Sequence, residues 1–135
     1  MGRPLIYLDA NVVIRLVEGD APTRAPLVAR LASSLGVSGS LVTSRLSRLE
    51  CRSKPLRAGD AATLAQFDVF FAGVELVLIE VTAAVVERAT ELRAKYNLNT
   101  PDALHYATAM EAGVAVFLTG DRGFARCSEM PVEIL

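Results

Sequence analysis

Short apolar runs alternate with segments of helical periodicity along this chain, and that alternation limits its possible folds more than any other feature. Strands are predicted at residues 4–9 (PLIYLD), 39–44 (GSLVTS), 74–81 (VELVLIEV), 114–120 (VAVFLTG) and 131–135 (PVEIL). Strands that alternate with helices are typical of α/β domains built on a mainly parallel sheet. The last strand is expected at an edge, because Pro131 cannot donate a hydrogen bond to a ladder.

The segments between these runs carry signals for helix ends. Helices are expected at 11–19, ending at Gly19; at 25–36, with Pro26 early and Gly36 after its end; at 45–54, stopped before Pro55; at 61–73; at 82–97, capped by Thr82; and at 100–113, with Thr100 as N-cap and Pro101 in the first position. Glycine after a helix and proline at its start are the usual placements of these residues.

Composition and length narrow the class of protein. With 135 residues, of which 52% are hydrophobic, the chain suits a single domain spanning 1–135 with a filled core. No apolar run is long enough to cross a membrane, and the N-terminus reads as the first strand rather than as a signal peptide. Cys51 and Cys127 fit free thiols in a reducing cytoplasm, where we expect the protein to reside.

Acidic residues follow two of the predicted strands directly. Asp9 ends the first apolar run, and Asp121 follows the fourth run in the same way. Binding sites in parallel sheets lie outside the carboxyl ends of the strands, so both carboxylates are expected at one edge. Each could instead be a turn residue or the cap of the next helix. Asn11 could be an N-cap or could orient Asp9.

Two further acids lie on predicted helices, and each has an ordinary structural explanation. Glu50 follows Leu46 by four residues, at the border of an apolar stripe, where a solvated surface glutamate is common. Asp102 falls in a first helical turn, where a negative charge suits the helix dipole. His105, one turn later, could hydrogen-bond Asp102, although a lone histidine is more often a packing or surface residue.

Bringing these acids together requires a counter-charge. Two unit charges ~4 Å apart repel by about 4 kcal/mol at an effective dielectric constant near 20. Carboxylates without cysteine or histidine companions suit Mg²⁺ or Mn²⁺. Such an ion can activate water and stabilise a leaving oxygen, which indicates phosphodiester hydrolysis.

Four segments of the sequence together resemble the PIN-domain nucleases, and in size and layout the VapC-type toxins of toxin–antitoxin pairs. They are YLDANVVI, SRLSRLECRS, NTPDALHYATA and FLTGDRGFAR, in the order found in that family. The resemblance implies a three-layer α/β/α fold with a mainly parallel sheet and a Mg²⁺- or Mn²⁺-dependent endoribonuclease activity on RNA. It also implies a VapB-like antitoxin as partner and a homodimer.

The resemblance also assigns roles to individual residues. The catalytic acids would be Asp9, Glu50, Asp102 and Asp121. Asp9 and Asp102 would bind the metal, with Glu50 and Asp121 acting directly or through water, while Asn11 and Thr119 would support them. Ala10 stands where many relatives carry Ser or Thr, and TGDRGFA supplies one acid where some relatives have two. One firmly held ion, with a second recruited by substrate, is therefore expected.

The sequence is also compatible with two other functions of a PIN domain and, less well, with one function on another fold. The chain could be a non-toxin PIN nuclease of RNA processing, or a PIN module that binds RNA or a partner without cutting. A phosphatase on another doubly wound fold, such as a haloacid-dehalogenase-like fold, is disfavoured because DAN lacks the second aspartate that such a site needs two residues after the first.

Partner surfaces can be suggested from the remaining sequence. A net charge of −1 gives no general attraction to nucleic acid, so RNA needs a local patch. The candidates are Arg45, Arg48, Arg52, Lys54 and Arg57, which could equally be a solvated helix face, and Arg122, which could instead form a surface ion pair. The segments 25–36 and 61–73 could form an apolar groove, which in relatives receives the antitoxin, or could simply cover the core.

Overall fold

A parallel sheet of five strands lies at the centre of the part of the chain that the computed structural model describes, residues 4–35 and 40–135. The strand order is β3-β2-β1-β4-β5, and every pairing is parallel. The strands are β1 (Leu5–Leu8), β2 (Ser40–Ser44), β3 (Leu76–Ile79), β4 (Val116–Thr119) and β5 (Val132–Ile134). The predicted parallel sheet and the edge position of the last strand are both confirmed.

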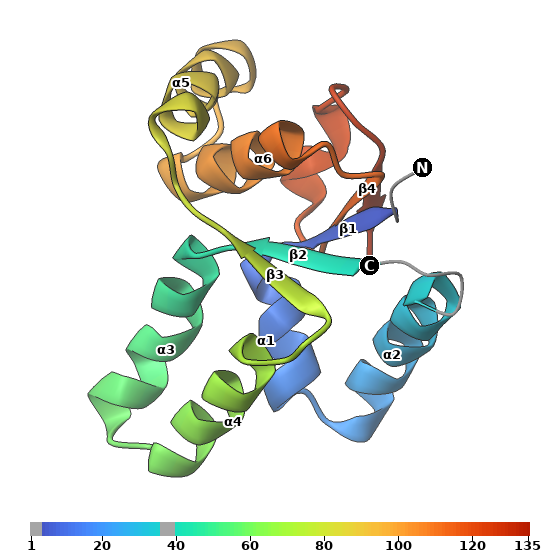
Figure 1. Ribbon diagram of the computed structural model, residues 1–135, viewed down its shortest axis with the longest axis vertical. Coiled ribbons are helices and arrows are strands. Elements are labelled where there is room, and N and C mark those ends of the chain that lie inside the picture. Colours follow the sequence, from blue (N-terminus) through green and yellow to red (C-terminus); the bar gives the residue numbers. More distant parts are fainter. Residues whose placement is uncertain (1–3, 36–39) are drawn as a thin grey trace.

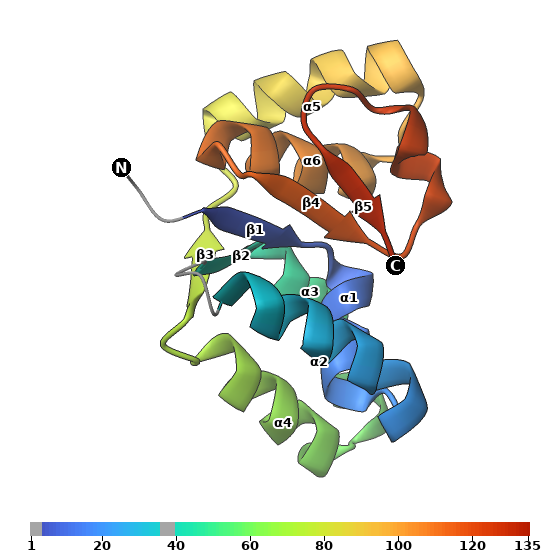
Figure 2. The ribbon, with the colours of Figure 1, turned by 90° about the vertical axis from the view of Figure 1, so that its right-hand side faces the viewer.

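Helices cover both faces of this sheet (Figure 1). One face carries α1 (Ala10–Glu18), α2 (Ala21–Leu35), α3 (Leu46–Ala58) and α4 (Ala61–Phe71), and the other carries α5 (Ala83–Tyr96) and α6 (Thr100–Ala112). A short 3₁₀ helix, η1 (Arg122–Arg126), connects β4 to β5. The turned view shows the same three layers (Figure 2), so the expected α/β/α architecture is confirmed. No helix in the described ranges is long and apolar enough to cross a membrane.

Neighbouring residues of one strand enter different halves of the core. Ile6 and Leu8 of β1 pack in the cluster that includes α1 and α2, whereas Tyr7 packs in the cluster that includes α5 and α6. Phe117 and Leu118 of β4 divide in the same way. Successive side chains of a strand point to opposite faces, and both faces here are buried. This explains why the strands read as continuous apolar runs.

Some predicted helix ends are confirmed. Thr82 caps α5 by accepting a hydrogen bond from the N–H of Val85. Gly19 follows α1, and a Cβ atom at this position would collide with the carbonyl oxygen of Arg15. The helix expected at 25–36 begins earlier, at Ala21, because Asp20 accepts the N–H of Thr23 and starts the helix there. The predicted stop at Gly36 lies outside the described residues.

Two predicted helix ends are wrong. Helix α3 does not stop before Pro55 but continues to Ala58, and it ends at Gly59, whose φ of 67° is in the left-handed region. An interior proline removes one backbone hydrogen bond and crowds the preceding turn, which α3 tolerates, whereas the left-handed Gly59 redirects the chain. The N-cap of α6 is Asn99 rather than Thr100, since the Asn99 side chain accepts the N–H of Asp102 at 2.8 Å.

Candidate metal centre

The carboxyl ends of β1 and β4 lie side by side, and each is followed within two residues by an acid. Tyr7 pairs with Phe117 and Leu8 with Leu118 in parallel register. Asp9 is the residue after β1 and is 3% exposed, and Asp121 is the second residue after β4 and is exposed. The sequence-based expectation that these two residues share one edge of the sheet is confirmed.

The buried carboxylate of Asp9 is held by three hydrogen bonds. Its Oδ1 accepts the N–H of Ala10 at 2.8 Å, while its Oδ2 accepts from the hydroxyl of Thr119 at 2.7 Å and from the amide of Asn11 at 3.0 Å. Asp9 is therefore both the N-cap of α1 and a residue of the acidic edge. Asn11 is not an N-cap but orients Asp9, and its Oδ1 also accepts the N–H of Gly120 at 2.7 Å.

Thr119 connects Asp9 to Asp121. Its hydroxyl donates to Asp9 and accepts the backbone N–H of Asp121 at 3.0 Å. Asp121 in turn caps η1, because its Oδ1 accepts the N–H of Gly123 at 2.8 Å. The two strand-end acids are thus fixed to one another through a completely buried threonine.

Asp102 shows that all four acids occupy one region. Its pKa is raised from 3.8 to about 6, first by burial and then by the negative charges of Asp9, Asp121 and Glu50, against an opposing contribution from His105. The acids come from β1, α3, α6 and the loop after β4. Four acids distant in sequence therefore lie close enough to influence one another's charge at one end of the sheet.

His105 is the feature that the sequence did not predict. Its ring is 1% exposed; Nδ1 lies 2.6 Å from the hydroxyl of Tyr7, and Nε2 lies 2.5 Å from Oε1 of Glu50. The hydrogen bond to Asp102 that the sequence allowed is not the one formed, because Nε2 contacts Glu50 instead; the buried ring agrees with the favoured alternative of a packing histidine. Glu50 is likewise not a freely solvated glutamate, since its side chain is 30% exposed and hydrogen-bonded. Neither pairing leaves a local signal in the sequence.

Tyr7 completes this buried group. Its hydroxyl accepts the N–H of Ser44 at 3.2 Å. Burial, reinforced by the charges of Asp9 and Glu50, raises the pKa of Tyr7 well above 10. The phenol therefore keeps its proton and can donate it in a hydrogen bond.

The basic residues near Glu50 are mostly neutralised by partners. Arg45 pairs with Glu80 at 2.6 Å, and both Arg52, at 2.9 Å, and Arg48, at 3.6 Å, approach Asp68. Arg48 also lies over the ring of Phe71. Within the described ranges the remaining candidates, Lys54, Arg57 and Arg122, have no ion-pair partner. The alternative of a surface ion pair for Arg122 is thus not realised.

The acidic centre offers oxygen ligands without a ready-made cage. Over residues 4–35 and 40–135, no group of three or more His, Cys, Asp or Glu side chains is arranged to hold a metal ion. Mg²⁺ is commonly bound through only one or two carboxylates and several waters. The acids of this centre thus supply oxygen ligands of the type that hard divalent cations take in proteins.

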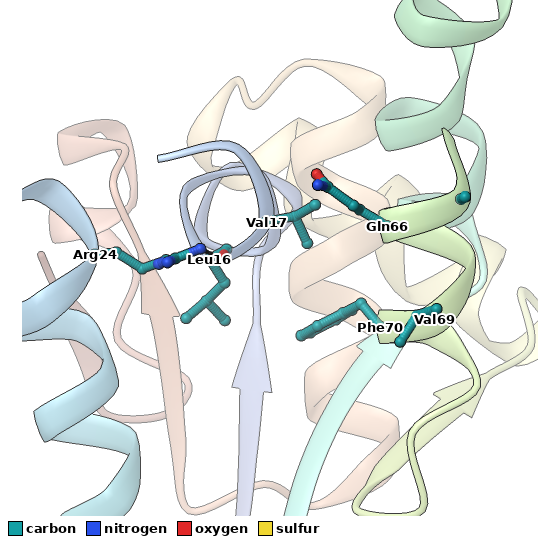
Figure 3. Close-up of a pocket in the computed structure, with 7 residues that line it drawn as sticks. Leu16, Val17, Arg24, Gln66, Val69 and Phe70 are labelled. Atoms are coloured by element: carbon teal, nitrogen blue, oxygen red, sulfur yellow. Dashed lines mark hydrogen bonds between the residues drawn. The ribbon is translucent and has the colours of Figure 1, made fainter. Parts of the chain in front are cut away.

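A separate apolar hollow lies between α1 and α4 (Figure 3). It measures about 510 Å³ and is lined by Leu16, Val17, Arg24, Ala65, Gln66, Val69 and Phe70. Arg24 extends from α2 toward Leu16 and donates a hydrogen bond to its carbonyl oxygen at 3.4 Å. The groove expected between segments 25–36 and 61–73 is therefore wrong in one of its walls: α1 and α4 form the hollow, and no described residue of 25–36 lines it.

Comparison with known proteins assigns the fold to a family. Residues 6–130 match the model of the PIN domain, and the chain belongs to this family. This confirms the resemblance noted in the sequence. A search of curated protein sequences gives no significant match.

Solved structures share the fold at low sequence identity. A chain of VapBC2 from Rickettsia felis, bound to a promoter DNA fragment, is 15% identical with a TM-score of 0.77, over 96% of this chain and 98% of that chain. VapC20 from Mycobacterium tuberculosis, described as a sarcin–ricin loop cleaving toxin, is 20% identical with a TM-score of 0.71. The match covers 93% of this chain and 98% of that chain. A chain of a toxin–antitoxin complex from Klebsiella pneumoniae is 20% identical with a TM-score of 0.70, over 95% of both chains.

Proposed function

We propose that this PIN domain, spanning residues 1–135, is a divalent-metal-dependent endoribonuclease and the toxin of a VapBC-type toxin–antitoxin pair. The observation that carries the proposal is the convergence of Asp9, Glu50, Asp102 and Asp121 at the carboxyl end of the sheet. Burial, and after it the charges of Asp9, Asp121 and Glu50, raise the pKa of Asp102, so a bound cation would favour its ionised form. Membership of the PIN family and the fold shared with VapBC proteins support this assignment.

The chemistry of the donor set points to Mg²⁺ or Mn²⁺ as cofactor. Asp9 and Asp102 are the proposed direct ligands, and Glu50 and Asp121 would act directly or through bound water. When bound, such an ion activates a water molecule and stabilises negative charge on a phosphodiester. Asn11 and Thr119 both donate to Oδ2 of Asp9, which fixes the orientation of the carboxylate before an ion arrives.

RNA would approach this centre beside residues whose charge is not already neutralised. Arg122 follows Asp121 immediately and is exposed, and Lys54 is exposed on α3. Because Arg45, Arg48 and Arg52 are paired with acids, their contribution to phosphate binding would require exchange of those partners. Arg122, Lys54 and Arg57, which is also exposed and has no ion-pair partner among the described residues, are accordingly the stronger RNA-contact candidates.

The hollow between α1 and α4 is the proposed site for a VapB-like antitoxin. Solved structures with this fold include toxin–antitoxin complexes. The exposed side chain of Val69 and the aromatic ring of Phe70 would accept apolar side chains, and Arg24 would meet a carboxylate.

The protein is also proposed to form a homodimer. Leu49 and Leu56 of α3, exposed at 64% and 63%, provide an apolar surface for such contact.

Metal-dependent RNA cleavage tests the central part of the proposal. The wild-type protein should cleave RNA with Mg²⁺ or Mn²⁺ and not with EDTA, and Asp9→Asn should abolish cleavage. Asp20→Asn is the matched control, because Asp20 is an exposed helix cap outside the acidic centre. An unchanged rate in Asp9→Asn would refute the site.

The biological role requires a second test. Expression of the wild-type protein should arrest growth, and Asp121→Ala should not. A small reading frame for a DNA-binding antitoxin directly upstream would support the toxin assignment. Cleavage without growth arrest, from a gene among RNA-processing factors, would instead favour a non-toxin PIN nuclease.

A further inference from the structure

The proposed function gives no role to His105, the sole histidine of the sequence, although its ring lies inside the acidic centre. Nε2 is 2.5 Å from Oε1 of Glu50 and 3.8 Å from Oδ1 of Asp9. No other hydrogen bond to the Glu50 carboxylate is formed within the described part of the chain. Glu50 belongs to α3 on one face of the sheet, and His105 belongs to α6 on the other. Their bond therefore joins the two helical layers at the edge where the acids meet.

The hydrogen bonds around the ring define which nitrogen carries the proton. A carboxylate only accepts, so Nε2 must donate to Glu50. Tyr7 already accepts the N–H of Ser44 and keeps its own proton, which it can donate to Nδ1. A ring with a proton on Nε2 and with Nδ1 facing the Tyr7 hydroxyl satisfies every one of these groups.

We propose that His105 is a positioning residue, whose Nε2–H holds the Glu50 carboxylate toward Asp9 and Asp102, and that Tyr7 fixes the required tautomer. This inference rests on the proposed metal-dependent function and extends it to the orientation of one of its acids. Without the imidazole, the partly exposed side chain of Glu50 has rotamers that carry its carboxylate into solvent. The acidic centre would then bind a divalent ion less tightly, even though all four acids remain.

A matched pair of substitutions separates positioning from packing. In His105→Gln, the side-chain amide can place an N–H where Nε2 lies, whereas in His105→Asn the shorter amide reaches only the position of Nδ1. Both variants lose the ring and should lose similar thermal stability. Mn²⁺ affinity, measured by the electron paramagnetic resonance signal of free Mn²⁺, should fall about 10–100-fold in His105→Asn and less than about threefold in His105→Gln. Equal losses in both variants would overturn the inference.

A double-mutant cycle tests whether His105 acts through Glu50. Mn²⁺ binding by Glu50→Gln should not weaken further when His105→Asn is added, because the carboxylate that the histidine holds is already absent. Additive losses would overturn the inference. In the metal-free wild-type protein, ¹⁵N NMR of the sole histidine should show a proton on Nε2. A proton on Nδ1 alone would contradict the assignment, whatever the stability of the variants.

Failure of the inference and failure of the proposed function give different results. Wild-type protein that binds Mn²⁺ and cleaves RNA, with His105→Asn unaffected, would overturn the role of His105 and leave the nuclease proposal intact. Wild-type protein that neither binds Mn²⁺ nor cleaves RNA would overturn both.

Discussion

Replacing Asp102 by Asn should stabilise the metal-free protein at neutral pH. The pKa of Asp102 is raised from 3.8 to about 6 by burial and by the neighbouring acids. One pKa unit corresponds to about 1.4 kcal/mol. Because Asp102 is partly exposed and solvent screens its charge, only about half of the full value, about 1.5 kcal/mol, is taken as the cost of its ionisation in the folded state. The substitution also removes the favourable interaction of the Asp102 charge with the first turn of α6, which lowers the free energy of unfolding by about 0.3–1 kcal/mol. A net gain of about 1 kcal/mol in the free energy of unfolding is therefore expected.

The sign of the pH dependence follows from linkage. Below pH 3.8 the carboxyl group is protonated in both the folded and the unfolded chain, so it contributes no penalty. Between this value and about pH 6 the unfolded chain ionises first, and the folded state is progressively disfavoured. Above that range the penalty is complete. The stabilising effect of Asp102→Asn should consequently be large at pH 7.5 and nearly absent at about pH 4.

Urea unfolding in EDTA at these two pH values measures the effect. Asp60→Asn is the matched control, because Asp60 is an exposed cap whose pKa is lowered by hydrogen bonds from Thr63. This control should not gain stability at pH 7.5. Adding Mn²⁺ should stabilise the wild-type protein and stabilise Asp102→Asn much less. A loss of stability in Asp102→Asn of the same size at both pH values would refute the reasoning.

Three further outcomes are expected. Thr119→Val removes the hydroxyl that donates to Asp9, and Mn²⁺ affinity measured by calorimetry should fall about 10–100-fold; an unchanged affinity would show that the hydroxyl does not orient Asp9. Val69→Asp places a charge in the hollow between α1 and α4, so it should prevent co-purification with a co-expressed antitoxin while RNA cleavage persists; retained co-purification would exclude this surface. Burial raises the pKa of Cys51 to about 12 and also raises that of Cys127, so neither thiol should react with a disulfide reagent at pH 8 until urea is added; rapid reaction of the native protein would contradict the buried positions.

The sheet and the strand-end acids could be predicted from the sequence because their signals are local. A strand buried on both faces is a continuous apolar run, and an acid directly after such a run must emerge at the carboxyl edge of a parallel sheet. Asp9 and Asp121 follow this rule. Their two possible roles, as helix caps and as members of the acidic centre, turned out not to exclude each other.

Other features depend on choices that the local sequence leaves open. Asn99 and Thr100 are adjacent and both can cap a helix, and the path of the chain selects Asn99. Proline frequently ends a helix, yet α3 continues past Pro55 and ends at the left-handed Gly59. The partner of Glu50 is His105, which is 55 residues away, and only the packing of α3 and α6 at one edge brings them together. The pairing of Arg48 and Arg52 with Asp68 could not be predicted either, because it depends on the packing of α3 against α4.

The location of a bound ion tests the central claim most directly. Crystals grown with Mn²⁺ and measured at the manganese absorption edge should show an anomalous peak at the carboxyl ends of β1 and β4, within coordination distance of Asp9 and Asp102. A peak elsewhere on the surface, or none at a Mn²⁺ concentration that supports RNA cleavage, would contradict the account.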